Sequence, residues 1–177
     1  SYVWSVDGSI QTETSSVFAG TFVAGSAIVC SVTPNDGTVD GTPAEKSITV
    51  GNTAPVVDTI SLSPSSVYTN DTITASVTTS DIDTTQTITV SYAWHVIDAN
   101  SGIDKTVQNS TTATLDGSSH FDKDDEVYVV ATANDGTDNS ATKTSSSITI
   151  LNSPPTDPVV SITPDPATVG TDDLTCT

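Results

Sequence analysis

Residues 127–137 read VYVVATANDGT, and this stretch decides the fold. Apolar side chains occupy every second position from 127 to 133, which is the period of a β-strand with one buried face. The inward residues on that strand are Val127, Val129, Ala131 and Ala133. The Asn-Asp-Gly that follows is the strongest short turn signal. The pattern recurs as IVCSVTPNDGT at residues 28–38, which lie 99 residues earlier.

Further matches keep the same order along the chain, so chance explains them poorly. Residues 47–49 recur as residues 147–149, and residues 61–64 recur as residues 161–164, each time 100 residues later. At the amino-terminal end, the tetrapeptide SYVW at 1–4 matches SYAW at 91–94, 90 residues later. Because this offset is shorter, the second copy holds additional residues after its Trp. These offsets predict a repeat unit of about 100 residues.

The matches divide the chain into three parts. Residues 1–52 form the carboxy-terminal part of one repeat, 53–152 form a complete repeat, and 153–177 contribute the first strands of a third. The junctions read NTAP at 52–55 and NSPP at 152–155. Proline stiffens a linker, so we expect semi-rigid joints. The first residues already follow a strand pattern, and we therefore expect the chain to be an excerpt of a longer protein.

The complete repeat divides into short strands separated by turn signals. Its third strand contains Trp94, and a polar corner is expected after Leu115. The strands that the sequence predicts are Val56–Leu62, Thr72–Thr78, Ile88–Val96, Thr111–Leu115, Val127–Ala133 and Thr144–Leu151. Many short strands in about 100 residues, with a Trp on the third, predict an all-β sandwich.

Composition limits the function. Hydrophobic residues make up 34% of the chain and Met is absent, so a thin core suits small sandwiches better than one large enzyme domain. Acidic residues number 22 and basic residues 4, which gives a formal net charge of −18. Phosphate backbones and anionic membranes attract clusters of Lys and Arg, so no nucleic-acid partner is expected. No apolar run approaches the roughly 20 residues of a membrane span, so no membrane insertion is expected in this segment.

The order of these features resembles a known family. A Pro-containing first strand, a Tyr-x-Trp third strand, an alternating valine strand and Asn-Asp-Gly-Thr together resemble the immunoglobulin-like and PKD-like repeats of large prokaryotic surface proteins. The joint at 52–56 resembles that of cadherin-like repeats. The resemblance implies tandem immunoglobulin-like β-sandwich repeats in an end-to-end array, located outside the cell or at its surface. Unlike antibody domains, the chain has Val127 and Ile28 where a tyrosine corner would need tyrosine.

The two cysteines fall at matching positions of this framework. Cys30 aligns with Val129 and Cys176 aligns with Ala75. In immunoglobulin-type domains the corresponding strands hold the disulfide between the sheets, so the resemblance implies that each Cys is half of a structural disulfide. A sandwich lies between the two, so each partner is expected outside the same chain copy. Either flanking sequence supplies the partners, or consecutive copies along a filament pair Cys176 with Cys30. A free buried thiol is the alternative.

Two acidic loops are candidates for calcium binding. In an immunoglobulin-like sandwich they would meet at one end, beside the linker that enters the repeat, and oxygen ligands at a joint suit calcium. The candidate ligands are Asp81, Asp83, Asn134, Asp135 and Asp138. The corner at 122–126 would face the next joint. The alternative is that these residues simply form turns and keep the protein soluble.

Other motifs are weaker. Asn70 and Asn109 begin glycosylation sequons, which chance alone can produce in a chain so rich in Ser and Thr. His95 and His120 are isolated, and no nucleophile and base occur together. We therefore expect no catalytic activity and no cofactor other than calcium.

Two functions remain open. The first is a structural or adhesive segment of a stalk, fibre or filament, whose partners are neighbouring repeats of the same or an identical chain. Any cell-surface or polysaccharide ligand would then bind elsewhere in the parent protein. The alternative is an accessory, carbohydrate-binding module of a secreted polysaccharide-acting enzyme. Such a module needs exposed aromatic side chains, for which Tyr68 and Tyr128 are the candidates.

Overall fold

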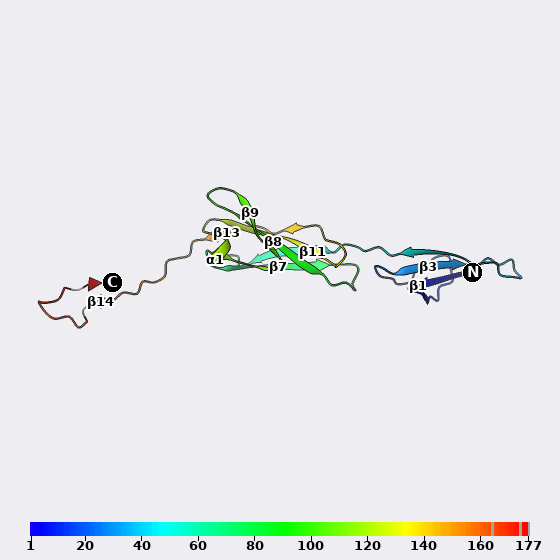
Figure 1. Ribbon diagram of the computed structural model, residues 1–177, viewed down its shortest axis with the longest axis horizontal. Coiled ribbons are helices and arrows are strands. Elements are labelled where there is room, and N and C mark those ends of the chain that lie inside the picture. Colours follow the sequence, from blue (N-terminus) through cyan, green and yellow to red (C-terminus); the bar gives the residue numbers. More distant parts are fainter. Residues whose placement is uncertain (164, 174, 177) are drawn as a thin grey trace.

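The computed structural model describes residues 1–177 except Pro164, Leu174 and Thr177. Its regular structure is almost entirely β, in several antiparallel sheets. Figure 1 shows three groups of strands in a row along the long axis, joined by extended segments. Among the described residues, every strand pair lies within 1–52, within 53–152 or within 153–177. The predicted all-β class is confirmed.

The first group is a single antiparallel sheet with the order β2-β1-β3-β4. Its strands are β1 (Tyr2–Val6), β2 (Ser9–Ile10), β3 (Ala27–Val32) and β4 (Ala44–Thr49). A tight turn at Asp7 and Gly8 joins β1 to β2, and both residues have positive φ. Trp4 lies opposite Cys30, which in turn lies opposite Lys46. These three residues therefore share one face of the sheet.

The central group is a sandwich of two sheets. The first sheet has the order β10-β7-β5 and consists of β5 (Val56–Ser63), β7 (Thr72–Ser80) and β10 (Thr114–Asp116). The second has the order β6-β13-β11-β8-β9, with β12 also paired to β11. Its strands are β6 (Val67–Tyr68), β8 (Thr89–Ile97), β9 (Asp104–Ser110), β11 (Glu126–Asn134), β12 (Lys143–Thr144) and β13 (Ile148–Leu151).

The core lies between these two sheets, and the predicted alternation is confirmed there. Every second residue of β11 from Val127 to Ala133 is fully buried. On β8 the buried positions are Tyr92, Trp94 and Val96, and on β7 they are Ile73 and Ala75. Trp94, the largest side chain with no exposed surface, belongs to this core together with Leu115 of β10. Burial of a side chain of this size stabilises a fold by a few kcal/mol, roughly 1.5–3 for an aliphatic or Phe side chain.

Three segments differ from the strands that the sequence predicts. β9 was not expected, because Val107 is its only large apolar residue. The expected strand at 144–151 is divided into β12 and β13, since Ser145 instead pairs locally with Val129 through backbone and side-chain hydrogen bonds. The fourth strand is shorter than expected and ends at Asp116.

The expected polar corner contains a short helix, α1 (Gly117–His120). Asp116 caps it by accepting a hydrogen bond from the Ser118 backbone N–H. Gly117 is required here, because a Cβ atom would collide with the Phe121 ring and with the Asp71 carbonyl oxygen. In the part of the chain that the structure describes, no helix is long and apolar enough to cross a membrane.

The first strand of the sandwich changes sheets. After β5 pairs with β7, the chain crosses over, and β6 pairs with β13 in parallel. The paired residues are Val67 with Ile150 and Tyr68 with Leu151. The beginning and the end of the central unit are thereby hydrogen-bonded to each other.

The third group is a small hairpin of β14 (Ile162–Thr163) and β15 (Thr175–Cys176). Ile162 pairs with Cys176, and Leu62 of the sandwich pairs with Ala75 in the same way. Two strand pairs of the first sheet join residues that the sequence offsets match to paired residues of the sandwich. The pairs Trp4–Cys30 and Ile28–Ile48 have the counterparts Trp94–Val129 and Val127–Ile148.

Candidate functional site

The linker that enters the central sandwich is held by side chains from two loops. Asn52 donates from Nδ2 to Oδ2 of Asp135 at 2.9 Å and to Oδ2 of Asp138 at 2.8 Å. Its Oδ1 accepts a hydrogen bond from Nε2 of Gln86 at 2.7 Å. Both N–H donors of the Asn52 amide and one lone pair of its oxygen are therefore hydrogen-bonded. We call Asn52, Asp81, Asp83, Gln86, Asp135 and Asp138 the joint cluster.

The Asn-Asp-Gly turn presents the carboxylates of one loop. Asn134 Oδ1 accepts from the Gly136 N–H at 2.8 Å, and Asp135 Oδ1 accepts from the Thr137 and Asp138 N–H groups, both at 2.7 Å. Gly136 has φ +96°, a conformation that side chains rarely adopt. The Asn52 amide, and then the backbone N–H donors, lower the pKa of Asp135 because they stabilise its charged form.

The other loop reaches the linker from β7. The Thr53 N–H donates to Asp83 Oδ2 at 2.8 Å, and the Asp83 N–H donates to Asp81 Oδ1 at 2.9 Å. Two acceptor oxygens in this loop, Asp81 Oδ2 and Gln86 Oε1, are buried without a hydrogen-bond partner among the described residues. Buried polar atoms usually have a partner, so these oxygens would accommodate a donor or a cation.

The structure thus brings together most of the predicted calcium ligands at the expected end of the sandwich. Asp135 and Asp138 both accept hydrogen bonds from Asn52. Asp83 accepts one from the next residue, Thr53, and Asp81 is bonded to the backbone of Asp83. Asn134 does not join them, because its side chain bonds within its own turn to Gly136, Asp138 and Asn139. Among the described residues, no group of three or more Asp, Glu, His or Cys side chains is placed to hold a metal ion. The amide groups of Asn52 and Gln86 were not part of the expected site.

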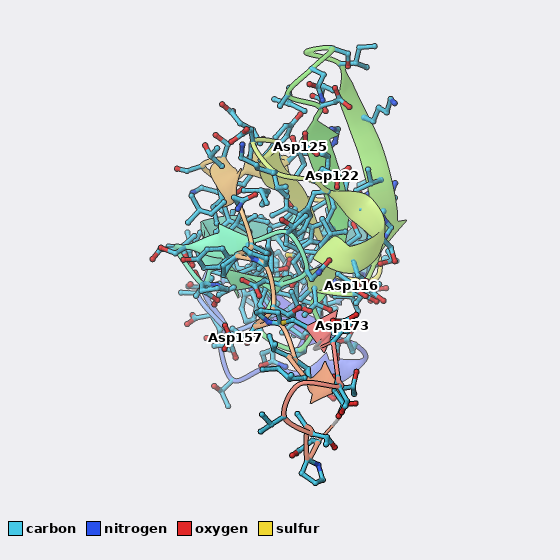
Figure 2. All side chains as sticks on the ribbon, turned by 90° about the vertical axis from the view of Figure 1, so that its left-hand side faces the viewer. Asp116, Asp122, Asp125, Asp157 and Asp173 are labelled. Carbon is cyan, nitrogen blue, oxygen red and sulfur yellow. The ribbon has the colours of Figure 1, made fainter. Side chains whose placement is uncertain are left out.

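The acidic corner at 122–126 lies at the opposite end of the sandwich. Figure 2 looks onto that end and shows Asp116, Asp122 and Asp125 there. Asp125 is buried and accepts from the Asp122 N–H at 2.8 Å and the Ala99 N–H at 2.9 Å. Its carboxylate therefore has a structural role that accounts for its burial.

The Asn-Asp-Gly turn is built in the same way in the first sheet. Gly37 N–H donates to Asn35 Oδ1 at 2.6 Å, and Asp36 Oδ1 accepts from Thr38 at 2.9 Å and from Val39 at 3.0 Å. These backbone donors lower the pKa of Asp36. Asp135 differs from Asp36 in one donor. The side-chain amide of Asn52 is the first cause of the lowered pKa of Asp135, whereas no side-chain donor contributes to the lowered pKa of Asp36.

A second cluster, which the sequence did not reveal, lies on β8, β9 and β11. The rings of His95 and Tyr128 stack with centroids 4.7 Å apart. Asp104 accepts from the Tyr128 hydroxyl through Oδ2 and lies 3.0 Å from His95 Nδ1 through Oδ1. The hydrogen bond to Asp104 raises the pKa of Tyr128 to about 12. Tyr128 and Glu126 also border a shallow surface hollow with Ile97.

The remaining candidate residues lie apart from both clusters. Cys30 is half-buried and Cys176 is exposed, and both thiols are free. Tyr68 is exposed on the short strand β6. The sequon residues Asn70 and Asn109 are also exposed, which an attached glycan would require.

Comparisons with known proteins leave the family unassigned. No protein-family model matches the sequence, and no curated protein is similar to it.

Proposed function

We propose that this chain is a non-catalytic segment of an extended extracellular array, in which tandem immunoglobulin-like sandwiches serve a structural or adhesive role. The recurring strand pairs support a repeat, since Trp4 with Cys30 and Ile162 with Cys176 reproduce pairs of the central sandwich. On this proposal 1–52 and 153–177 belong to neighbouring repeats, and the function follows from length and stiffness. The acidic surface favours solubility.

The strongest support for the proposal is that the linker into the sandwich is hydrogen-bonded to two of its loops. Asn52 bonds to Asp135 and Asp138 of one loop, while the next residue, Thr53, bonds to Asp83 of the other. A linker tied to two loops has fewer orientations than a free one. The joint therefore transmits the direction of one unit to the next, which suits a rod more than a flexible tether.

The test measures how widely the joint bends. Spin labels at exposed Ser47 in β4 and Ser76 in β7, in a chain with both native cysteines replaced by Ser, report the distance between the first sheet and the sandwich. We expect a narrow distance distribution that Asn52→Ala broadens. Asn109→Ala, in exposed β9, is the matched control and should leave the width unchanged. An equally broad distribution in the parent chain and in Asn52→Ala would argue against a rod.

Calcium is the cation that we propose for the joint cluster. Its preferred ligands are carboxylate and carbonyl oxygens, and Asp81 Oδ2 and Gln86 Oε1 are two such buried atoms without a donor. A bound cation would lie beside the linker and further restrict it. No three acidic side chains of the described residues are placed to share an ion in this structure. The two loops would therefore have to close around the cation for Asp81, Asp83, Gln86, Asp135 and Asp138 to supply oxygens.

Melting curves test this cation. If calcium binds only the folded joint, millimolar calcium should raise the melting temperature of the chain relative to EDTA. Asp83→Asn should reduce that increase, whereas Asp157→Asn, in the extended segment after the sandwich, should not. Equal melting temperatures in calcium and EDTA would mean that the acidic loops are turns and solubility features only.

A carbohydrate-binding module is the second candidate, and the His95–Tyr128 stack favours it. Tyr128 was expected to be exposed but is half-buried, as is His95, and the two rings stack on each other, so only their outer surfaces and the Asp104 carboxylate would be available to a sugar. Affinity electrophoresis in gels containing soluble polysaccharides would detect retardation. Retardation lost in Tyr128→Ala but kept in Tyr68→Ala would support this second role, and unretarded migration in every polysaccharide would exclude binding to those sugars.

A further inference from the structure

A histidine on the outer face of the sandwich lies between a carboxylate and a hydroxyl group. His95 of β8 approaches Asp104 Oδ1 through Nδ1 at 3.0 Å and Thr106 Oγ1 through Nε2 at 3.3 Å. Both partners belong to the neighbouring strand β9. Carboxylate, imidazole and hydroxyl thus follow one another in the order in which an acid orients a base that activates a nucleophile. Local sequence patterns did not indicate this, because the partners of His95 are 9 and 11 positions away in the chain.

The Asp104 carboxylate fixes which nitrogen of His95 carries the proton. The Tyr128 hydroxyl, and then His95, lower the pKa of Asp104, so the carboxylate is ionised at neutral pH and only accepts hydrogen bonds. His95 Nδ1 is therefore the donor, and in the neutral imidazole Nε2 then has a free lone pair. Thr106 accordingly donates its hydroxyl proton toward Nε2. This is the arrangement in which a histidine acts as a general base.

The imidazole ring is held in place and is still accessible. It stacks on the Tyr128 ring, and Asp104 contacts both rings through its two oxygens. The His95 side chain is 21% exposed, and Thr106 is exposed. Because β9 is the last strand of its sheet, alternate backbone N–H groups along its outer edge have no strand partner among the described residues. Backbone N–H groups stabilise the oxyanion of an acyl-transfer intermediate when they point toward it.

The first sheet has a different surface at the matching positions. The sequence offset of 90 matches His95 with Ser5, and the offset of 99 matches Tyr128 with Val29. Ser5 and Val29 lie opposite each other as the two rings do, but they form no stack. Where the first sheet has the two-residue strand β2, the sandwich has the seven-residue strand β9, which stands apart from the other strands at the top of Figure 1. A unit that served only as a spacer would not need this longer hairpin.

We propose that Thr106 is an acyl-acceptor site, whose hydroxyl attacks the carbonyl carbon of a neutral activated ester, such as an aryl ester or a thioester. His95 Nε2 takes the hydroxyl proton as the C–O bond to Thr106 forms. The bond from the acyl carbon to the leaving group then breaks, and the leaving group departs with that proton, so no oxidant or reductant takes part. The net charge of −18 disfavours anionic donors such as acyl phosphates. This inference goes beyond the structural role proposed above and does not depend on it.

Acetylation of the full chain by p-nitrophenyl acetate, followed by peptide mapping in a mass spectrometer, tests the site. Thr106 should be acetylated faster than exposed Thr59, whose hydroxyl bonds to another threonine hydroxyl instead of a base. A positioned general base contributes about 10²–10⁴-fold, so His95→Gln should slow acetylation of Thr106 about a hundredfold or more. His120→Gln is the matched control and should leave the rate unchanged. Hydroxylamine distinguishes the Thr106 ester, which it cleaves, from an amide on the adjacent Lys105. Equal rates at Thr106 and Thr59, or an unchanged rate in His95→Gln, would overturn the proposal.

Ultraviolet titration of Tyr128 shows whether a variant keeps this surface folded. The hydrogen bond to Asp104 raises the pKa of Tyr128 to about 12, and neither Thr106 nor the imidazole takes part in that bond. One tyrosine should therefore still titrate near that value in Thr106→Val and in His95→Gln. Thr106→Ser, which keeps a hydroxyl beside His95 Nε2, should restore the acetylation that Thr106→Val loses. A folded Thr106→Ser that is acetylated no faster at this position than at Thr59 would also overturn the proposal.

Discussion

A pair of cysteines placed in the central sandwich would test the alignment on which the repeat depends. Ala75 of β7 and Val129 of β11 occupy the positions that Cys176 and Cys30 hold in the two flanking groups, and both are buried in one core. If the alignment is right, Ala75→Cys/Val129→Cys brings two thiols within bonding distance. The disulfide would link the two sheets within the core that contains Trp94.

The expected magnitude follows from the length of chain that the bond would close. The loop from 75 to 129 contains about 55 residues, and the chain-entropy relation gives about 4 kcal/mol for a loop of this size. For a unit of about 100 residues, each kcal/mol raises the melting temperature by roughly 4–8 °C, so an increase of roughly 15–30 °C is the upper expectation. Strain in the native state reduces that increase.

Differential scanning calorimetry of the oxidised and reduced variant measures this difference directly, with thiol titration to show that the bond has formed. Ala75→Cys/Val130→Cys is the matched control, because Val130 follows Val129 on the strand and points to the opposite face. That control should keep its thiols free. Two free thiols in Ala75→Cys/Val129→Cys after oxidation, or ready bond formation in the control, would refute the alignment.

Three further predictions concern single sites. Trp94→Ala should destabilise the sandwich by about 3–5 kcal/mol in urea unfolding, because the residue has no exposed surface. The pKa of Asp135 is lower in the folded chain than its value of about 3.9 in the unfolded chain. The ionised carboxylate therefore stabilises the fold at pH values above about 3.9, and this stabilisation is lost as the pH falls through the folded pKa. Asn52→Ala removes the hydrogen bond that is the first cause of this lowered pKa. The melting temperature of the variant should therefore fall less steeply than that of the parent chain as the pH is lowered, and an equally steep fall would contradict the prediction. The hydrogen bond to Asp104 raises the pKa of Tyr128 to about 12, so Asp104→Asn should bring one tyrosine back toward about 10 in ultraviolet titration.

The sequence predicted β8 and β11 well because of where these two strands lie. β8 and β11 lie in the middle of their sheet and bury one face each, so their side chains alternate clearly between apolar and polar. β9 lies at the edge, and its pairing with β8 depends on backbone groups that every residue possesses. Its polar sequence therefore gave no signal. The helix α1 is also set by local contacts, around Gly117 and Phe121, that periodicity does not detect.

The joint was predicted in part. Sandwich topology places the loop after β7 and the loop after β11 at one end, so the acidic residues of both loops could be expected near the linker. The role of Asn52 could not, because its partners Gln86, Asp135 and Asp138 are 34, 83 and 86 positions away in the chain. Side-chain hydrogen bonds over such separations leave no local pattern. The same holds for the contact of His95 with Tyr128.

The parallel pairing of β6 with β13 has a mechanical consequence. Tension along the chain would enter the central unit before Val56 and leave it after Leu151. The bonds that join Val67 to Ile150 and Tyr68 to Leu151 lie between those two points. Pulling in opposite directions along two parallel strands loads their hydrogen bonds in shear, so they must break together rather than one by one. The unit would therefore resist stretching at this patch, and a shear flow or a moving surface would extend the linkers before it unravelled the sandwich.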